Sequence, residues 1–485
     1  MLFNSYTFLV FYALVYAAYV ALSRKTSAQN MLLLVSSYVF YAAWDYRFLS
    51  LILLSTIVDF FAGQRIEKGT ARSRRGWLIS SLVVNLGVLA MFKYYDFSVE
   101  SFCQLTTMFG IGLSVPMAEI ILPVGISFYT FQTLSYTIDV YRGRVSACNN
   151  PLGFAVYVAF FPQLVAGPIE RATHFLPQVL GSRKIRRVDL AIGAQFVLLG
   201  YFYKVVLADS IAPMVNQFYG SPERYGGSIA WLANLGFAVQ IYGDFAGYSL
   251  IARGISRWMG FRLMANFRQP FLASSPRDFW TRWHRSLSQW LRRYLYFELG
   301  GSRRGFTCTC RNLMLTMLLG GLWHGASWNF VIWGGYHGIL LLGQHAWMVM
   351  CSVRRTERSG QTVSDHVHSE RWSRNILQCA KILSTFVLML IGWNLFRCDS
   401  FSGIIVTFSR MFVAPLADPR WISFAAPIAT AFAIMLAIDV WKEKLKCELV
   451  FLRAPVMVRW GVYSMIVFSL LSVGFRPTSF IYFQF

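Results

Sequence analysis

Charged residues are scarce in this sequence. Only 14% of the 485 residues are charged, whereas 56% are hydrophobic. Since charged residues make up about a quarter of a typical soluble domain, this chain has too little polar material to cover a soluble surface. Acidic residues are especially few, because 22 Asp and Glu stand against 45 Lys and Arg, a formal net charge of +23. The basic residues lie in short runs between apolar segments, which is typical of membrane proteins and not of nucleic-acid-binding proteins. We therefore predict a polytopic membrane protein with no nucleic-acid partner.

Motifs for disulfides, metals and secretion are also missing. The eight cysteines are scattered, and the close pair Cys308 and Cys310 has neither the spacing nor the companions of a metal site. We predict no disulfide framework and no bound metal. The first residues lack a basic n-region and a small-residue cleavage site, so the apolar run 5–22 is interpreted as a retained first helix and not as a signal peptide.

Apolar runs of about 20 residues mark membrane spans, and the distribution of Lys and Arg orients them. The stretch 94–120 has no Lys or Arg and is predicted to be an external loop, whereas the basic stretch 65–75 is predicted to be cytoplasmic. We predict about 11 to 12 spans, with both termini outside the bacterial cytoplasmic membrane. The segment 151–168 is broken by proline and glycine, which favours a re-entrant segment. The predicted spans are 5–22, 31–44, 48–63, 77–95, 121–140, 190–207, 229–251, 312–329, 330–350, 376–395, 424–440 and 460–475, and the short apolar piece 401–412 is ambiguous.

A histidine stands inside the apolar, glycine-rich stretch 318–329. An ionisable ring at such a depth is by default functional or carefully hydrogen-bonded. Gly321 and Gly325 flank His324 and leave room for a backbone, a file of water or a substrate beside the ring. We predict that His324 is catalytic. The alternative is a core histidine that holds two close-packed helices together.

A second histidine lies in the arginine-rich region that precedes this stretch. Ser275 to Asp278 has a helix-capping serine, a proline at the first helical position and an acid in the first turn. Apolar residues then recur at helical spacing from Phe279 to Tyr294, which predicts one amphipathic helix lying in the membrane interface. His284 falls at the edge of its apolar face and is the second candidate catalytic residue. The alternative is a histidine that faces the surface.

Four stretches have the character of motifs and not of generic apolar sequence. They are PVGISFYTFQ at 123–132, IDVYRG at 138–143, DFWTRWH at 278–284 and GLWHG at 321–325. In these stretches the chain resembles the membrane-bound O-acyltransferase family, in its bacterial alginate O-acetylation and teichoic acid D-alanylation branch. The resemblance implies an all-α polytopic fold with a central tunnel, and it implies that His324 and His284 are the two signature positions.

The resemblance also implies a single transmembrane acyltransferase domain that covers residues 1–485. We expect N-terminal helices in 1–145, a catalytic core with re-entrant and interfacial helices in 146–350, and C-terminal helices with an external tail in 351–485. Acyl transfer from a thioester needs no permanently bound cofactor, because the donor is already activated, but it needs a base. A neutral, buried His324 suits that task. Further candidates for lining or supporting the tunnel are Trp323, Asn329, Asp244, Gln240 and Trp283. Packing is the alternative for Trp323 and Asn329, and a structural partnership with Lys93 or Lys204 is the alternative for Asp244.

The function implied by the resemblance is O-acetylation of an exported or cell-surface polysaccharide such as alginate. The expected donor is acetyl-CoA on the cytoplasmic side, and the expected partner is an exported, esterase-like acyltransferase. D-alanyl transfer and the acylation of a lipid or protein hydroxyl remain open. A different class also remains open, namely a proton-coupled transporter or flippase in which His324 belongs to a proton relay.

The tail 478–485 is rich in aromatic residues. Aromatic side chains prefer a groove or the membrane interface over bulk water. The tail also resembles a C-terminal aromatic motif of this bacterial branch in which a tyrosine carries the acyl group. Tyr482 is therefore a possible acyl relay, with an interfacial anchor as the alternative.

Overall fold

The computed structural model describes residues 1–113, 115–165, 167–358, 370–474, 478 and 480–481. All regular secondary structure within these residues is helical, which confirms the predicted all-α class. Six helical stretches in the described part are long and apolar enough to cross a membrane, so the chain is a multi-pass membrane protein. They are Thr26–Lys68, Ala71–Met108, Arg187–Gly220, Asn375–Arg397, Trp421–Leu445 and Val456–Val473. The total of about 11 to 12 spans stays a prediction.

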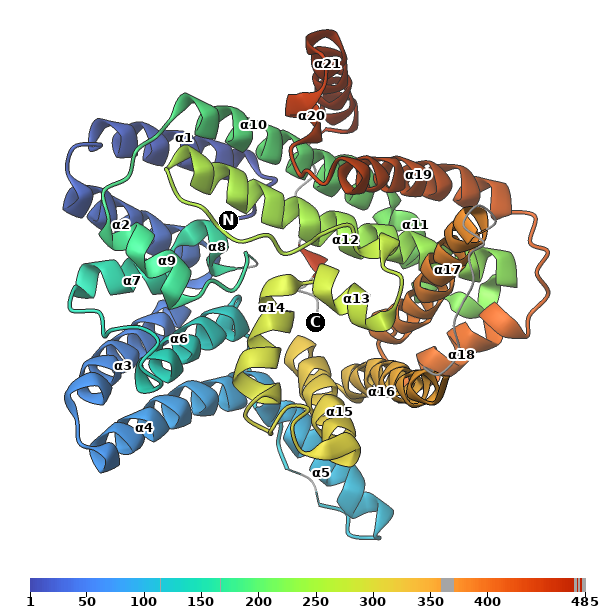
Figure 1. Cartoon of the computed structure of the whole chain (residues 1–485), viewed down its shortest axis with the longest axis horizontal. Helices are drawn as coiled ribbons and strands as arrows, with labels where there is room; N and C mark the ends of the chain where they lie inside the picture. Colours follow the sequence, from blue (N-terminus) through green and yellow to red (C-terminus); the bar gives the residue numbers. More distant parts are fainter. Residues whose placement is uncertain (114, 166, 359–369, 475–477, 479, 482–485) are drawn as a thin grey trace. The chain divides into compact units, whose positions relative to one another are not determined.

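Figure 1 labels the helices along the chain. They fall into two compact units, each assembled from separate segments of the sequence. The first unit contains residues 1–206, 244–265 and 451–485, and the second contains 207–243 and 266–450. The elements η3, α12 and α20 have residues in both.

The first unit contains the N-terminal helices and the last helix. Its elements are α1 (Tyr6–Ala21), α2 (Thr26–Asp45), η1 (Tyr46–Phe48), α3 (Leu49–Lys68), α4 (Ala71–Leu89), η2 (Ala90–Tyr94), α5 (Tyr95–Met108), α6 (Ile126–Tyr141), α7 (Pro151–Ala159), α8 (Phe161–Leu164), α9 (Ala172–Leu180), α10 (Arg187–Tyr201), η3 (Phe202–Asp209), α12 (Gly227–Trp258), α20 (Val450–Arg453) and α21 (Val456–Val473).

The second unit contains both candidate histidines. Its remaining elements are α11 (Ser210–Gly220), η4 (Pro222–Arg224), η5 (Pro270–Leu272), α13 (Pro276–Arg282), α14 (Arg285–Leu291), η6 (Arg292–Tyr296), α15 (Gly305–His324), α16 (Trp328–Arg358), α17 (Glu370–Arg397), α18 (Phe401–Phe412) and α19 (Trp421–Leu445).

The first half of the stretch 94–120, predicted to be an external loop, is helical, because α5 runs to Met108. The side of the membrane on which this stretch lies stays a prediction. No glycine or proline interrupts the chain between Tyr95 and Met108, and Asp96 lies in the first turn, where a negative charge stabilises a helix. The Asp96 carboxylate also accepts backbone hydrogen bonds of 3.0 Å from Ala118 and Ile120. The stretch therefore contains a helix followed by a segment that folds back onto the start of that helix.

The broken segment at 151–168 is a pair of short helices buried inside the first unit. Asn150 caps α7 by accepting a hydrogen bond from the Gly153 amide at 2.8 Å, and Pro151 occupies the first turn. The chain bends at Phe160, and α8 then begins with the Phe161 amide donating to the Ser37 hydroxyl at 3.0 Å. Irregular backbone at membrane depth is tolerated where protein surrounds it, which agrees with the full burial of Phe160 and Phe161.

Candidate active site

His324 is the last residue of α15, so the prediction that its helix runs to residue 329 is wrong. The chain leaves the helix at Gly325 in an extended conformation. A side chain at Gly325 would meet the ring of Phe330, and a side chain at Gly321 would meet the backbone carbonyl of Phe330. The two glycines thus let α15 and α16 approach closely, which places the His324 ring at a helix end against the neighbouring helix.

His284 lies between two helices, so the prediction of one continuous amphipathic helix from Phe279 to Tyr294 is also wrong. The predicted start holds, because the Ser275 hydroxyl accepts a hydrogen bond from the Asp278 amide at 3.2 Å. The helix then stops after Arg282, and His284 adopts a left-handed backbone conformation with φ 39° and ψ 55°. This conformation is costly for a residue with a Cβ and indicates that the surrounding structure enforces it.

The enforcing structure is the loop that precedes η5. The Arg285 amide donates to the Asn266 carbonyl at 2.8 Å, and the Ser286 hydroxyl donates to the Asn266 side-chain oxygen at 2.6 Å. On the other side of His284, the Arg268 amide donates to the Arg282 carbonyl at 3.0 Å. These hydrogen bonds replace the helical ones that a continuous helix would make, and they turn the His284 ring inward. The ring is 0% exposed, which rules out the surface-facing alternative.

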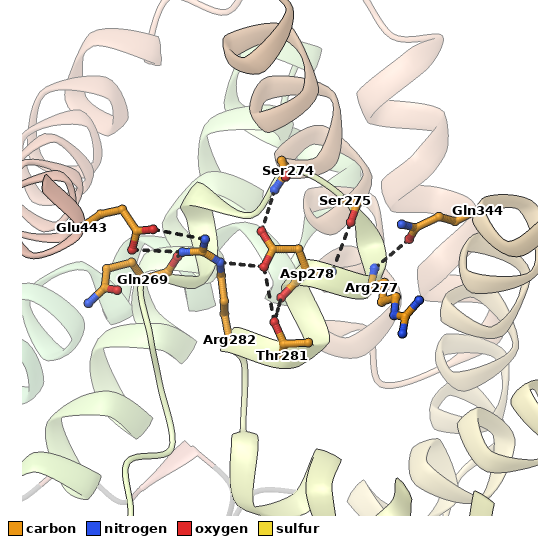
Figure 2. Close-up of polar contacts among 9 residues, drawn as sticks. All are labelled: Gln269, Ser274, Ser275, Arg277, Asp278, Thr281, Arg282, Gln344 and Glu443. Carbon is orange, nitrogen blue, oxygen red and sulfur yellow. Dashed lines mark hydrogen bonds and ion pairs between the residues drawn. The ribbon is translucent and has the colours of Figure 1, made fainter. Parts of the chain in front are cut away.

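Charged side chains hold α13 in place from two sides (Figure 2). The Asp278 carboxylate accepts from the Ser274 amide at 3.1 Å and from Arg282 Nε at 2.9 Å. Arg282 also reaches Glu443 on α19, with N–O distances of 3.2 and 3.3 Å. At the start of the helix, the Arg277 amide donates to the Gln344 side chain on α16 at 2.9 Å. Two helices far apart in sequence therefore position the turn that carries His284.

The structure brings the two predicted histidines together. The ring centroids of His284 and His324 are 6.4 Å apart, and His324 is only 5% exposed. Trp323 lies beside both rings, at 5.8 Å from His284 and 5.0 Å from His324. Trp333 and Phe396 pack edge-on against His324 at 5.1 and 5.5 Å. The result is a pair of buried imidazoles with aromatic walls.

Trp283, Asn329 and Gln240 were also predicted to line or support the site. The Trp283 ring is fully buried and stacks on Phe279 at 5.6 Å. The Asn329 side-chain amide donates to the Cys398 carbonyl at 2.7 Å, a bond that fastens the start of α16. Gln240 on α12 is half-buried. A direct role for these three residues stays a prediction.

Asp244 belongs to the first unit, where it forms a buried ion pair with Lys204 at 2.8 Å. Its second carboxylate oxygen accepts the Ile481 amide at 2.6 Å, and Phe480 packs on Tyr248 at 5.0 Å. Asp244 thus holds the segment that leads toward the predicted relay residue. Tyr482 itself lies outside the described residues.

Three residues near the histidine pair are missing from the predicted site. Trp333 and Phe396 touch the His324 ring, and His337 lies 4.8 Å from Trp333. His337 carries the signal that singled out His324, because it is a histidine beside glycines in an apolar helix. Nothing in the sequence alone marks Phe396, whose helix α17 meets the site only through the tertiary fold.

Comparison with known proteins agrees with this class of site. The model of the membrane-bound O-acyltransferase family matches residues 146–364, which include both histidines. The chain is 40% identical over 415 residues to "Probable alginate O-acetylase AlgI" of Pseudomonas aeruginosa, covering 85% of this chain and 75% of that protein. It is 34% identical to the peptidoglycan O-acetyltransferase of Helicobacter pylori, covering 66% and 65% of the two chains. It is 31% identical to the teichoic acid D-alanyltransferase of Streptococcus thermophilus, covering 46% and 57%.

The fold and the buried histidine pair define a multi-pass, all-α membrane enzyme that transfers acyl groups to hydroxyls. The chain belongs to the membrane-bound O-acyltransferase family. Membership favours acyl transfer over the transporter alternative.

Proposed function

We propose that the protein transfers an acetyl group from cytoplasmic acetyl-CoA toward an exported or cell-surface polysaccharide. The names of the most similar relatives support acetyl over D-alanyl, because alginate O-acetylases match 85% of the chain and the D-alanyltransferase only 46%. A polysaccharide outside the membrane requires the acetyl group to cross it. An exported, esterase-like partner completes the transfer.

The observation that carries the proposal is the His284–His324 pair. The acceptor oxygen forms a bond to the thioester carbonyl carbon while His324 takes the hydroxyl proton. The carbon–sulfur bond then breaks, and the leaving thiolate recovers a proton from the His324 imidazolium, which releases the thiol and restores the base. His324 accepts the proton in its neutral form, and the same form is restored at the end of the cycle.

His284 supplies the second function. A neutral imidazole keeps one N–H donor, which can stabilise the negative charge that develops on the thioester carbonyl oxygen. Two hydrogen bonds of about 2.9 Å can meet at one reacting group between rings at this separation. The 6.4 Å between the ring centroids therefore suits a base and an oxyanion donor on either side of one carbonyl.

The tail carries the acetyl group outward. In the proposed path, His324 activates the phenol of Tyr482, and the resulting aryl ester passes the acetyl group to the exported partner. The contact between Asp244 and the Ile481 amide supports this path, because it fixes the backbone one residue before the tyrosine. The positive-inside pattern supports a protein in the cytoplasmic membrane with both ends outside.

The test uses the full-length protein in proteoliposomes with radiolabelled acetyl-CoA. We expect label on the peptide that contains Tyr482 in the wild type, and none in His324→Ala. In Tyr482→Phe we expect no label on that peptide and no acetylation of the final acceptor. Acceptor acetylation at the wild-type rate in Tyr482→Phe would rule out the tail as a relay, and labelling from a D-alanyl donor alone would replace the acetyl assignment.

A further inference from the structure

Two acidic residues on α19 take no part in the chemistry proposed above. Asp439 and Glu443, called the acid pair below, are four residues apart, so their side chains lie on one face of the helix. Asp439 is 1% exposed, and Glu443 is half-buried. The buried Lys442 places a positive charge on the same side of the helix as Asp439. Buried carboxylates also need hydrogen-bond donors, and the acid pair finds them beside the segment that leads to His284.

Glu443 holds Arg282, the last residue of α13. Nη1 and Nη2 of Arg282 donate to the two carboxylate oxygens of Glu443, at 3.2 and 3.3 Å (Figure 2). Two parallel hydrogen bonds of this kind fix direction as well as distance. Nε of the same guanidinium donates to Asp278 at 2.9 Å, so the group is held from two sides. Glu443 thereby fixes the side chain two positions before His284.

Asp439 supports the next residue of the chain, Trp283, through a tyrosine. The Tyr242 hydroxyl on α12 donates to the two carboxylate oxygens of Asp439, at 3.2 and 3.0 Å. The Tyr242 ring lies 6.1 Å from the Trp283 ring, and Phe267 lies 5.5 and 5.0 Å from the two. Tyr242, Asp439 and Trp283 are each at most 2% exposed. The hydrogen bond to Asp439 therefore fixes a ring that supports the Trp283 indole.

The two contacts end on the two residues that precede the left-handed turn. His284 has φ 39° and ψ 55°, a conformation that is costly for a residue with a Cβ. Such a residue relaxes to a commoner conformation unless its neighbours prevent it, and the direction of its ring changes with the backbone. Hydrogen bonds to Asn266 and from Arg268 hold the backbone of the turn, whereas the acid pair holds the side chains that lead into it.

The contact with α19 goes beyond what the stability of α13 needs. Arg282 and Asp278 already form an ion pair of 2.9 Å within that helix, at the four-residue spacing that stabilises helices. Glu443 adds a contact 161 residues away in sequence. A contact inside a helix stabilises the helix wherever it lies, whereas a contact to another helix fixes its place. The acid pair therefore fixes where the end of α13 lies, and with it where the turn at His284 begins.

Resting on the proposed function, we propose that Asp439 and Glu443 are positioning residues for acyl transfer. They set the direction of the His284 ring through the two residues that precede it, and neither acid meets the reacting atoms. Their effect reaches the reaction through the N–H donor of His284, whose distance from the developing oxyanion decides how much charge it stabilises. A displacement of about 1 Å at a catalytic group can cost roughly 100-fold in rate, so the loss of one supporting contact should cost less.

The experiment measures whether the acid pair acts through His284. Glu443→Ala is made in the wild type and in His284→Ala, and transfer from radiolabelled acetyl-CoA is measured per folded molecule of the full-length protein in proteoliposomes. We expect Glu443→Ala to lower kcat about tenfold in the wild type, with KM for acetyl-CoA within about twofold. In His284→Ala the same change should cost less than about twofold, because the ring that the acid positions is gone. Tenfold losses in both backgrounds would show that Glu443 only supports the fold and would overturn the proposal.

Milder variants test both contacts and guard against a protein that fails to fold. Glu443→Gln keeps an acceptor oxygen but loses the charge, and Tyr242→Phe keeps the ring against Trp283 but loses the hydroxyl bound to α19. Each should lower kcat about threefold in the wild type and have no effect in His284→Ala. Lys444→Gln changes an exposed charge at the next position of α19 and serves as the control, with kcat expected at the wild-type value. Wild-type kcat in both mild variants would overturn the proposal.

Amide hydrogen exchange keeps the inference separate from the proposed function. The Arg285 amide donates to the Asn266 carbonyl at 2.8 Å, so its exchange rate reports on the turn at His284. We expect peptides that cover 283–288 to exchange roughly tenfold faster in Glu443→Ala than in the wild type, and peptides that cover 317–324 to be unchanged. Equal exchange of 283–288 in the two proteins would overturn the positioning role. If exchange changes as expected but the wild type transfers no acetyl group from acetyl-CoA, the proposed function fails while the positioning role remains.

Discussion

The two units of the protein bury polar groups in different ways. In the first unit, Asp59 on α3 is fully buried, and its carboxylate accepts from Ser81 at 2.6 Å and from Asn85 at 3.0 Å. Ser55 in turn donates to the Asn85 oxygen at 2.6 Å. In the second unit, the buried histidines at 284, 324 and 337 are surrounded by aromatic rings.

The difference shows how a structural polar cluster can be distinguished from a catalytic site. Short hydroxyl and amide side chains satisfy one another completely, which stabilises the helix packing and leaves nothing for a ligand. Aromatic walls keep water away from the histidines of the second unit, which suits proton transfer in a closed site. Depth in the membrane alone does not distinguish the two cases.

The largest expected effect comes from removing the base. We expect His324→Ala to lower acyl transfer by at least about 100-fold, the usual contribution of a general base. Its melting temperature should fall, because the ring is buried among aromatic side chains, so transfer is compared per folded molecule. Transfer is measured in membranes with matched amounts of protein, and His345→Ala serves as the control on α16. Wild-type transfer by His324→Ala would remove His324 from the mechanism.

His284 should respond to the kind of replacement. Its left-handed backbone suits asparagine better than alanine, and asparagine also keeps an N–H donor. We expect His284→Ala to lose about 100-fold in kcat and His284→Asn only about tenfold, with the higher melting temperature in His284→Asn. If both variants lose activity equally, His284 does more than donate a hydrogen bond.

In the first unit the expected effect falls on stability. Asp59→Leu removes the carboxylate to which the Ser81 hydroxyl and the Asn85 amide donate, and leaves them only the Thr137 hydroxyl and the Ser81 carbonyl as acceptors. The loss of these hydrogen bonds to a charged group should cost about 1–3 kcal/mol. Asp59→Asn keeps an acceptor of the same shape and should be milder. We expect a lowered melting temperature in detergent, with transfer per folded molecule unchanged. An Asp59→Asn protein that folds normally but has lost transfer would break the distinction between the two units.

Much of the site was predictable from the sequence, for local reasons. A histidine among glycines in an apolar helix is costly unless it has a task, and that argument identified His324. The capping serine at 275 and the proline after it predicted the start of α13 correctly. His337, beside glycines in an apolar helix, carries the same local signal.

What could not be predicted depends on contacts between distant segments. The helical spacing of apolar residues from 279 to 294 is genuine, but hydrogen bonds to Asn266 and from Arg268 replace the helical ones around His284. The end of α15 at His324 follows from the approach of Phe330 on another helix. A pattern within one segment contains no information on such partners, which decide where a helix stops.

The smallest expected effect concerns His174 on α9, whose Nδ1 lies 2.7 Å from the buried carboxylate of Glu170. Glu170 also accepts the Met264 amide at 2.6 Å, so the pair fastens the loop after α12 within the first unit. The hydrogen bond that His174 donates to the Glu170 carboxylate raises the pKa of His174 above its ordinary value of 6.5, against the opposing effect of burial.

A raised pKa in the folded state means that protonated His174 stabilises the fold. The stabilisation is fully present below the ordinary pKa of 6.5 and is lost as the pH rises through the raised value. Because the His174 side chain is 48% exposed, we expect no more than about 1 kcal/mol, or a few degrees in melting temperature. Melting curves of the wild type and His174→Gln at pH 5.5 and pH 8.5 measure it. The wild type should lose more stability than His174→Gln on going to pH 8.5, and equal losses would show that the pair does not fasten the loop.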